Sequence, residues 1–307
     1  MNSTQSLNFF RQAAPWLEHF GQRLEGQYPK YAQTARALLH DAPATVKFVL
    51  PDDGIIFDDG FKGVPDDFRL PYPAILLEFY CTYKETGQKG KVIVYAYQRD
   101  KSILILCLEN NTGKNGKERW DLMPFVAECM AMSEAGELDN AVTMQVLEEK
   151  NLTLETARRI PQAAVRHWDM GPITIDAFGD KWKALAYTSM SPAQSAVFSL
   201  IEALSCSNVG SEPLPVRKAN KGALKRGVLP FDEYRVLTVR PGHGSSSADG
   251  DIYLSSNGRS PREHLRRGHI RRLQNGKKIW VNAHVVNAGV QGKLHKTYNI
   301  TAPVAQP

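Results

Sequence analysis

Hydrophobic residues near the start of the chain recur at three- and four-residue steps, the spacing that places them on one face of an α-helix. The first set is Phe9, Phe10, Ala13, Leu17 and Phe20, and the second is Tyr28, Tyr31, Ala35, Leu38 and Leu39. This spacing predicts helical structure over residues 7–40. Proline restricts the backbone of the residue before it and lacks a backbone donor, so Pro15 and Pro29 are expected to break or kink the stretch.

Apolar runs of strand length dominate the next part of the chain. They occupy residues 44–50, 74–83, 91–97 and 102–108, and residues 120–130 form a further strand or the start of a helix. Short polar segments at residues 84–90 and 98–101 connect the runs over 74–83, 91–97 and 102–108, whereas a parallel crossover needs about a dozen residues or more. The spacing therefore favours an antiparallel meander.

Helical spacing returns in the middle of the chain, over residues 137–159 and again over residues 191–206. In the second stretch Ser191 is placed to cap the helix, Pro192 fits its first turn, and Gln194 completes a capping box. We therefore expect this helix to begin at its serine-proline pair.

The pair Asn275-Gly276 separates two β-compatible runs, which is the strongest short-range pattern for a β-hairpin. Both residues tolerate a positive φ, so the pattern predicts a two-residue type I′ turn. A loop of this length places Arg271 opposite Trp280 and His269 opposite Asn282. The sequence thus predicts both a hairpin and its register.

Alternation along the two strands divides the predicted hairpin into an inward and an outward face. The inward face carries Ile270, Ile279, Val281, Ala283 and Val285. The face expected to meet solvent or a ligand carries Arg267, His269, Arg271, Lys278, Trp280, Asn282 and His284. All these elements together predict an α+β fold with N-terminal helices, an antiparallel β-meander, central helices and a C-terminal basic β-hairpin.

Charge is distributed unevenly along the chain, although the net charge is only +6. From Pro213 onward there are 17 Lys and Arg residues against 5 Asp and Glu, whereas the preceding residues hold 21 and 27. We expect an acidic α+β body over residues 1–208, a basic linker over 209–230, and a basic, β-rich C-terminal region over 231–307 with the hairpin at 264–286. A basic surface of this kind suits a polyanionic partner.

Several features are typical of a cytoplasmic protein. No apolar run approaches the roughly 18 residues needed to span a bilayer, and the first residues lack the basic and apolar regions of a secretory signal. The four cysteines lie far apart in the sequence, mostly within apolar runs. This pattern favours buried, reduced thiols over disulfides or a metal site. We expect a cytoplasmic location and no membrane partner.

The outward face of the hairpin combines arginines, imidazoles and an indole, a set suited to nucleic acid. Arg and Lys neutralise phosphates, and Trp280 offers a stacking platform worth about 1–3 kcal/mol per unpaired base. The predicted nucleic-acid contacts are Arg262, Arg266, Arg267, His269, Arg271, Arg272, Lys277, Lys278, Trp280 and His284. A purely structural alternative pairs Arg271 with Trp280 in a cross-strand cation–π contact.

An enzymatic alternative uses the histidines of the same region. His264 and His269 lie among arginines, which are the residue types of a metal-independent nuclease. In such a site one imidazole takes the 2′-hydroxyl proton and the arginines hold the phosphate. The sequence pairs no carboxylate with either imidazole, and zinc binding by these histidines lacks a nearby cysteine. We therefore expect a binding protein rather than an enzyme, with no cofactor and no metal.

Glu78 belongs to a second, incomplete nuclease pattern. Asp66, Glu78 and Lys84 are similar to the PD-(D/E)xK arrangement, but the lysine follows the glutamate by six residues and would not lie beside it on a strand. Phosphate-binding lysine loops, dinucleotide glycine fingerprints and serine-hydrolase elbows are absent from the sequence. The common nucleotide-dependent and hydrolase classes are therefore disfavoured.

Two stretches resemble a group of proteins encoded by tailed bacteriophages and prophages. The first is DDFRLPYPAILLEF, from Asp66 to Phe79, and the second runs from SPREHLRRGHIRR at Ser260 through the Asn-Gly turn to WVNAHVV at Val286. A looser similarity covers the basic residues 217–226 and the segment that follows them. The resemblance implies a phage setting, in the cytoplasm of a host cell, and favours nucleic-acid handling or antagonism of host machinery over metabolism.

Two hypotheses of different classes follow. The first is a phage-encoded protein that binds RNA or single-stranded nucleic acid through the Arg/His/Trp face of the hairpin. The second is an interaction or inhibitor protein whose basic hairpin binds an acidic host or defence protein. Nuclease activity through His264 and His269 is the enzymatic alternative to both.

Overall fold

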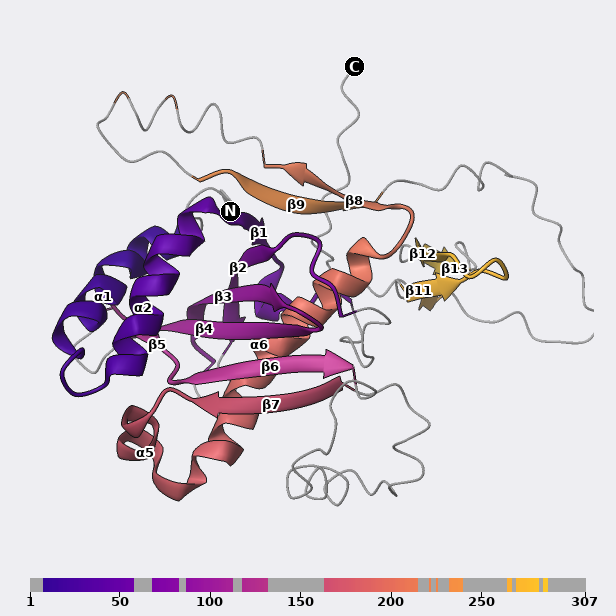
Figure 1. The fold of residues 1–307 in the computed structure, drawn as a ribbon. Coiled ribbons are helices and arrows are strands. Elements are labelled where there is room, and N and C mark those ends of the chain that lie inside the picture. Colours follow the sequence, from indigo (N-terminus) through magenta and orange to yellow (C-terminus); the bar gives the residue numbers. More distant parts are fainter. Residues whose placement is uncertain are drawn as a thin grey trace, which may run out of the picture.

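The computed structural model describes residues 8–57, 68–82, 87–112, 118–131, 163–214, 221, 225, 232–239, 264–266, 269–281 and 284–286. Over these residues a nine-stranded sheet carries helices on both of its faces (Figure 1). Two small antiparallel strand pairs from the C-terminal part of the chain lie outside that sheet.

The helices are α1 (Phe9–Arg23), α2 (Pro29–Asp41), α5 (Pro172–Phe178) and α6 (Trp182–Leu204), with 3-10 turns η2 (Ala42–Ala44), η3 (Asp52–Gly54) and η5 (Gly179–Lys181). The strands of the main sheet are β1 (Val46–Val49), β2 (Ala74–Thr82), β3 (Lys89–Arg99), β4 (Ser102–Thr112), β5 (Glu118–Leu122), β6 (Phe125–Ala131), β7 (Ala163–Asp169), β8 (Val209–Pro213) and β9 (Tyr234–Val239). Outside it, β10 (His264–Arg266) pairs with β13 (His284–Val286), and β11 (His269–Arg272) pairs with β12 (Lys278–Val281).

Neighbouring strands of the main sheet are mostly antiparallel, in the order β7-β6-β4-β3-β2-β1-β9-β8. Strands β2, β3, β4, β6 and β7 form the meander, and β5 pairs with the far end of β4. Strand β1 is the exception, because it runs parallel to both β2 and β9. The predicted α+β fold and its antiparallel meander are confirmed.

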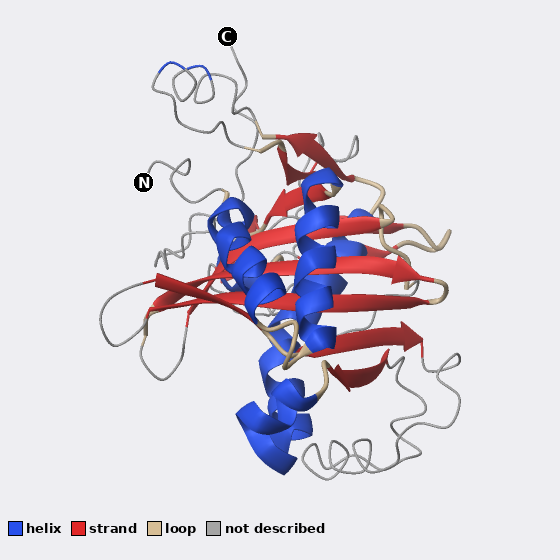
Figure 2. Cartoon of the chain, turned by 60° about the vertical axis from the view of Figure 1, so that its left-hand side comes forward, coloured by secondary structure: helices blue, strands red, loops and turns tan. Residues whose placement is uncertain are grey.

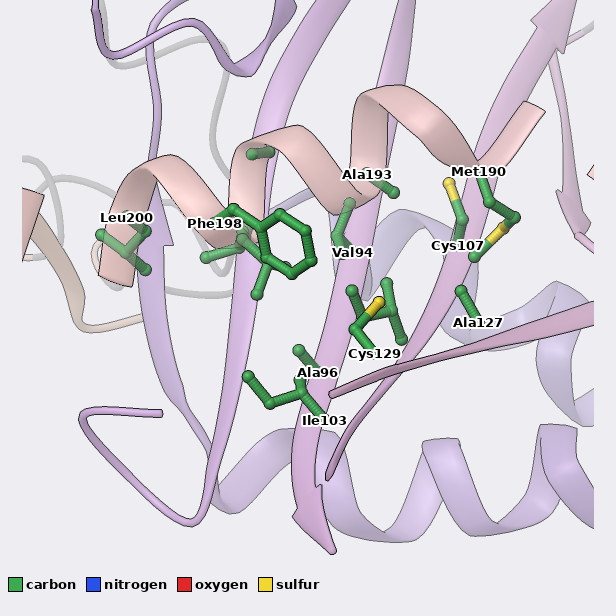
Figure 3. Packing of buried hydrophobic residues seen from close by; sticks show 14 of the residues in the cluster. Val94, Ala96, Ile103, Cys107, Ala127, Cys129, Met190, Ala193, Phe198 and Leu200 are labelled. Atoms are coloured by element: carbon green, nitrogen blue, oxygen red, sulfur yellow. The ribbon is translucent and has the colours of Figure 1, made fainter. Parts of the chain in front are cut away.

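Alternating side chains of the central strands enter two separate cores, one on each face of the sheet. On one face, Leu76, Ile93 and Leu106 pack against α1 and α2, which lie across the strands in Figure 2. On the other face, Val94 and Cys107 pack against α6, as Figure 3 shows. Because both faces are covered by helices, these strands read as continuous apolar runs in the sequence.

Helix α6 begins earlier than its capping pattern predicts. It starts at Trp182, so Pro192 lies inside the helix and Ser191 is not its N-cap. Buried Ala186 and Met190 extend the apolar stripe of α6 back toward its start, and their packing on the sheet outweighs the helix-breaking tendency of proline. Pro15 likewise lies inside α1, whereas the predicted break before Pro29 is confirmed. The helix predicted over residues 137–159 lies outside the described residues.

Glu78 links three distant parts of the fold. Its carboxylate accepts hydrogen bonds from the backbone N–H groups of Phe9 and Phe10 at 3.1 and 2.9 Å, at the start of α1. It also accepts a bond of 2.9 Å from the hydroxyl of Tyr234 on β9. The residue that the incomplete nuclease pattern singles out therefore satisfies the N-terminus of a helix.

Strand β9 belongs to the predicted C-terminal region, and it lies in the main sheet between β1 and β8. Arg11 of α1 forms an ion pair with Asp232, immediately before this strand. The division of the chain at residues 209–230 stays a prediction.

Candidate binding site at the C-terminal hairpin

The turn between β11 and β12 contains three loop residues, Gln274, Asn275 and Gly276. The Leu273 N–H donates to the Lys277 carbonyl at 2.8 Å, and the Gly276 N–H donates to the Leu273 carbonyl at 2.9 Å. Gly276 has a φ of 78°, whereas Asn275 is not among the described residues with a positive φ. This is the geometry of a type I turn closed by a left-handed glycine, not of a type I′ turn.

The additional loop residue shifts the register of the hairpin by one position. Ile270, instead of Arg271, lies opposite Trp280, and His269 lies opposite Val281. Side chains alternate between the two faces along a strand, and residues opposite one another share a face. A shift of one position therefore brings together side chains that the predicted register placed on opposite faces. The predicted register is therefore wrong, although the hairpin itself is confirmed. The predicted cross-strand contact between Arg271 and Trp280 is wrong for the same reason.

Trp280 faces the body of the protein and is only 6% exposed. Its indole stacks on Phe57, with ring centroids 4.8 Å apart and planes 25° from parallel. Ala203 and Cys206, at the end of α6, complete the buried cluster around it, and burial raises the pKa of the Cys206 thiol to about 11. The interpretation of Trp280 as an exposed stacking platform is corrected by this packing.

Asn208 connects the hairpin to the segment that follows α6. Its side-chain amide donates to the Trp280 carbonyl at 2.7 Å, and its side-chain oxygen accepts from the Trp280 N–H at 2.7 Å. Ser207 adds two bonds to the Lys278 carbonyl, from its backbone N–H at 2.9 Å and its hydroxyl at 3.1 Å. These contacts pair β12 with the loop after α6 as a neighbouring strand would.

Lys278 is also turned inward, contrary to the predicted outward face. Its ammonium donates to the Glu202 carboxylate at 2.6 Å, and each side chain is 8% exposed. Glu202 is an isolated carboxylate in the apolar last turns of α6. A charge in such a run requires a buried partner. The pair fixes the hairpin against α6 without adding net charge.

An open cleft of about 490 Å³ lies between the hairpin, the end of α6 and the segment before β2. Its apolar lining residues are Pro71, Ile201 and Leu204. Its polar lining residues are Arg69, Glu202, Ser205, Ser207, Lys277 and Lys278, with Gly276 at the hairpin turn. The cleft thus combines apolar lining residues with basic residues from two distant parts of the chain.

Four basic side chains are exposed at the cleft and on the hairpin beside it. Arg69 and Lys277 line the cleft itself, and Arg271 and Arg272 lie on β11. Arg271 lies opposite Ile279, on the hairpin face that points away from the body. Among the described side chains, Arg271, Arg272 and Lys277 of the hairpin are exposed and basic, and Arg69 lines the same cleft as Lys277.

The remaining predicted contacts are described only in part. Arg262 and Arg267 lie outside the described residues. For His264, Arg266, His269 and His284 the structure describes the backbone alone, with Arg266 opposite His284 and His264 opposite Val286. The nucleic-acid contacts and the nuclease alternative that depend on these side chains stay predictions.

Residues suited to metal binding do not gather anywhere in the described part of the chain, where no group of three or more His, Cys, Asp or Glu side chains could hold an ion. None of the described helices combines the length and the apolar character that crossing a membrane requires.

No curated protein and no solved structure matches the chain. A model of the AcrVA2-like family, described as the anti-CRISPR type V subtype A2 family, matches residues 57–288. This span begins at the residue that stacks on Trp280 and includes α6, the segment before β2 and both strands of the hairpin. Because the match covers well over half of the chain, the protein belongs to the AcrVA2-like anti-CRISPR family.

Proposed function

We propose that this protein inhibits a type V CRISPR defence system by binding a protein component of that system at the cleft beside the hairpin. The family match is the observation on which this proposal rests, because its description names type V systems and its span contains every residue of the cleft. Countering a host defence also agrees with the phage setting implied by the resemblance. The match favours the inhibitor hypothesis over the nucleic-acid hypothesis.

Rigidity of the cleft supports a role in binding. Lys278 and Trp280 are fixed by Glu202, Asn208 and Phe57, so β12 has little freedom to move relative to α6. A wall that is ordered before binding loses less conformational entropy when a partner arrives. Exposed Lys277 and Arg271 stand next to this fixed framework and offer donors to a partner.

The positive charge of the cleft indicates which surface of the CRISPR component it could contact. CRISPR effector complexes hold the guide–target duplex in a positively charged channel. A protein that occupied such a channel in place of nucleic acid would need an acidic surface. Arg69 and Lys277 make the cleft basic, so we propose contact with an acidic protein surface outside that channel.

Nucleic-acid binding by the same region is the second candidate. Its support is the exposure of Arg271 and Arg272 on β11, since such side chains can neutralise phosphates. Burial of Trp280 removes the base-stacking contribution that this hypothesis assigned to the hairpin. Any binding would then depend mainly on charge and fall steeply with salt.

An interference assay tests the proposed function. Cells that carry a type V system and a spacer against a phage are challenged with and without this protein, and plaque number is counted. We expect the protein to restore plaques, and the double variant Arg69→Glu with Lys277→Glu to restore far fewer at equal protein level. Lys181→Glu is the matched control, because it is an exposed reversal at the opposite end of α6, roughly 30 Å away. An absence of plaque recovery by the parent protein would overturn the proposal.

A second measurement separates protein binding from nucleic-acid binding. The purified protein is mixed with each purified, nuclease-treated component of the type V system and passed through a sizing column. We expect a stoichiometric complex with a component that has an acidic surface, lost in the double variant and retained in Lys181→Glu. Complex formation only after nucleic acid is added back would favour the second candidate.

A further inference from the structure

We infer that the cleft receives an acidic segment of the partner protein. An apolar side chain of this segment packs against the apolar lining residues of the cleft, and a carboxylate of the segment binds the basic lining residues. This inference rests on the proposed function and specifies the chemistry of the partner at the same site. The apolar and the basic lining residues each contribute a separate requirement, and the hydroxyl groups of Ser205 and Ser207 add a third.

The apolar lining residues require an apolar group from the partner. Pro71, Ile201 and Leu204 line the cleft, and a volume of about 490 Å³ accommodates side chains rather than a folded domain. Apolar surface gains free energy only when another apolar group removes it from water. A sugar–phosphate backbone would leave this apolar surface exposed to water, whereas a leucine-like or aromatic side chain would cover it.

The basic lining residues require an anionic group from the partner. Lys278 and Glu202 neutralise each other inside the wall, so they add no net charge to the cleft. Arg69 and Lys277 therefore provide its excess positive charge, and neither forms an ion pair with another described residue. A carboxylate placed between them would form charge-assisted hydrogen bonds.

The serines in the wall favour a protein over a phosphate chain. The Ser205 hydroxyl donates to the Glu202 carbonyl at 2.7 Å, and the Ser207 hydroxyl donates to the Lys278 carbonyl at 3.1 Å. Each hydroxyl hydrogen is thus already used, and the lone pairs that remain accept hydrogen bonds. A peptide backbone supplies N–H donors to such acceptors, whereas ionised phosphates supply none.

Three short labelled peptides test the inference by fluorescence anisotropy with the whole protein. The first contains glutamate and leucine between flexible Gly-Ser ends, the second replaces its glutamates with glutamine, and the third replaces its leucines with serine. We expect the first peptide to bind, and each of the others to bind about tenfold or more weakly. Equal binding of all three peptides would overturn the inference, and so would stronger binding of a labelled oligo(dT).

Charge reversal on the protein assigns that binding to the cleft. We expect the double variant Arg69→Glu with Lys277→Glu to lose affinity for the first peptide by about tenfold or more, and Lys181→Glu to keep it. Matching melting temperatures for the three proteins exclude a folding defect. Unchanged peptide affinity in the double variant would overturn the placement in the cleft.

Testing the same variants in the interference assay separates the two proposals. Loss of peptide binding together with loss of plaque recovery supports both. If the double variant loses plaque recovery but the parent protein does not bind the first peptide, the acidic-segment inference is overturned and the proposed function stands. Peptide binding that depends on Arg69 and Lys277, with plaque recovery unaffected, supports the ligand class and overturns the role of the cleft in inhibition.

Discussion

Lys278 and Glu202 form an ion pair of 2.6 Å in which each side chain is 8% exposed. The two residues come from β12 and α6, and their pairing holds the hairpin against the helix. A buried pair of this kind contributes little net stability over apolar replacements, because both charges lose their hydration. Removal of one partner has a large effect, because the other charge stays buried without its counterion.

This asymmetry gives the first prediction. We expect Glu202→Gln to lower the free energy of unfolding, or of local hairpin release, by about 3 kcal/mol, and Lys278→Met to act similarly. The double variant Glu202→Gln with Lys278→Met should regain most of the loss, because neither charge is then left without its partner. Urea denaturation and amide hydrogen exchange at Trp280 provide the measurements. Additive losses in the double variant would contradict this explanation of the contact.

The second prediction concerns Asn208, whose side chain satisfies both backbone groups of Trp280. Asn208→Ala leaves this donor and this acceptor without their partner. We expect a loss of about 2 kcal/mol, seen as roughly 30-fold faster exchange of the Trp280 amide. Ser205→Ala is the control, since its hydroxyl donates to the Glu202 carbonyl of α6 and not to the hairpin strand β12 in the described part of the chain. Equal exchange rates in the two variants would show that Asn208 does not hold the strand.

The helices and the antiparallel strands of the main sheet could largely be predicted from the local spacing of apolar residues. Strands such as β3 and β4 alternate between two helical layers, and short polar connections leave only an antiparallel meander. The parallel position of β1 between β2 and β9 has no local pattern behind it, because β9 is about 190 residues away in the chain. Pairing at that separation depends on the assembled core.

The candidate site was predictable only in part. Asn275-Gly276 indicates a hairpin, but a glycine with positive φ suits both a two-residue and a three-residue loop, and the two differ by one residue in register. The contacts that accompany the observed register come from Glu202 and Asn208, more than 70 residues earlier. Glu202 was the available indication, because a lone carboxylate in an apolar helix end requires a cation nearby. The partner that it finds is Lys278, which the predicted register placed on the outward face.

The turn supplies the third prediction. Gly276 has a φ of 78°, a conformation that disfavours side chains other than asparagine and aspartate. We expect Gly276→Ala to destabilise the docked hairpin by about 1 kcal/mol and Gly276→Asn by clearly less. No atom lies within 4 Å of a Cβ built at this position, so the difference reports backbone strain rather than a clash. Thermal denaturation of the two variants measures it, and equal losses would contradict the assigned turn.

The last prediction follows from Glu78 at the start of α1. Burial raises the pKa of this carboxyl group from 4.5 to about 7, and the bonds from Phe10, Tyr234 and Phe9 offset the effect only in part. Between these two values the folded state binds more protons than the unfolded state. Stability from this group is therefore fully present below about pH 4.5 and is lost as the pH rises toward 7.

We expect the free energy of unfolding to fall by up to about 1.4 kcal/mol per pH unit across this range because of Glu78 alone. Glu78→Gln cannot ionise, so its stability should lose this slope. Urea denaturation at several values between pH 4.5 and 8 measures both proteins under matched conditions. Glu118→Gln is the control, because that carboxylate lies on the surface and pairs with Lys91. Retention of the full slope in Glu78→Gln would assign the pH dependence to other groups.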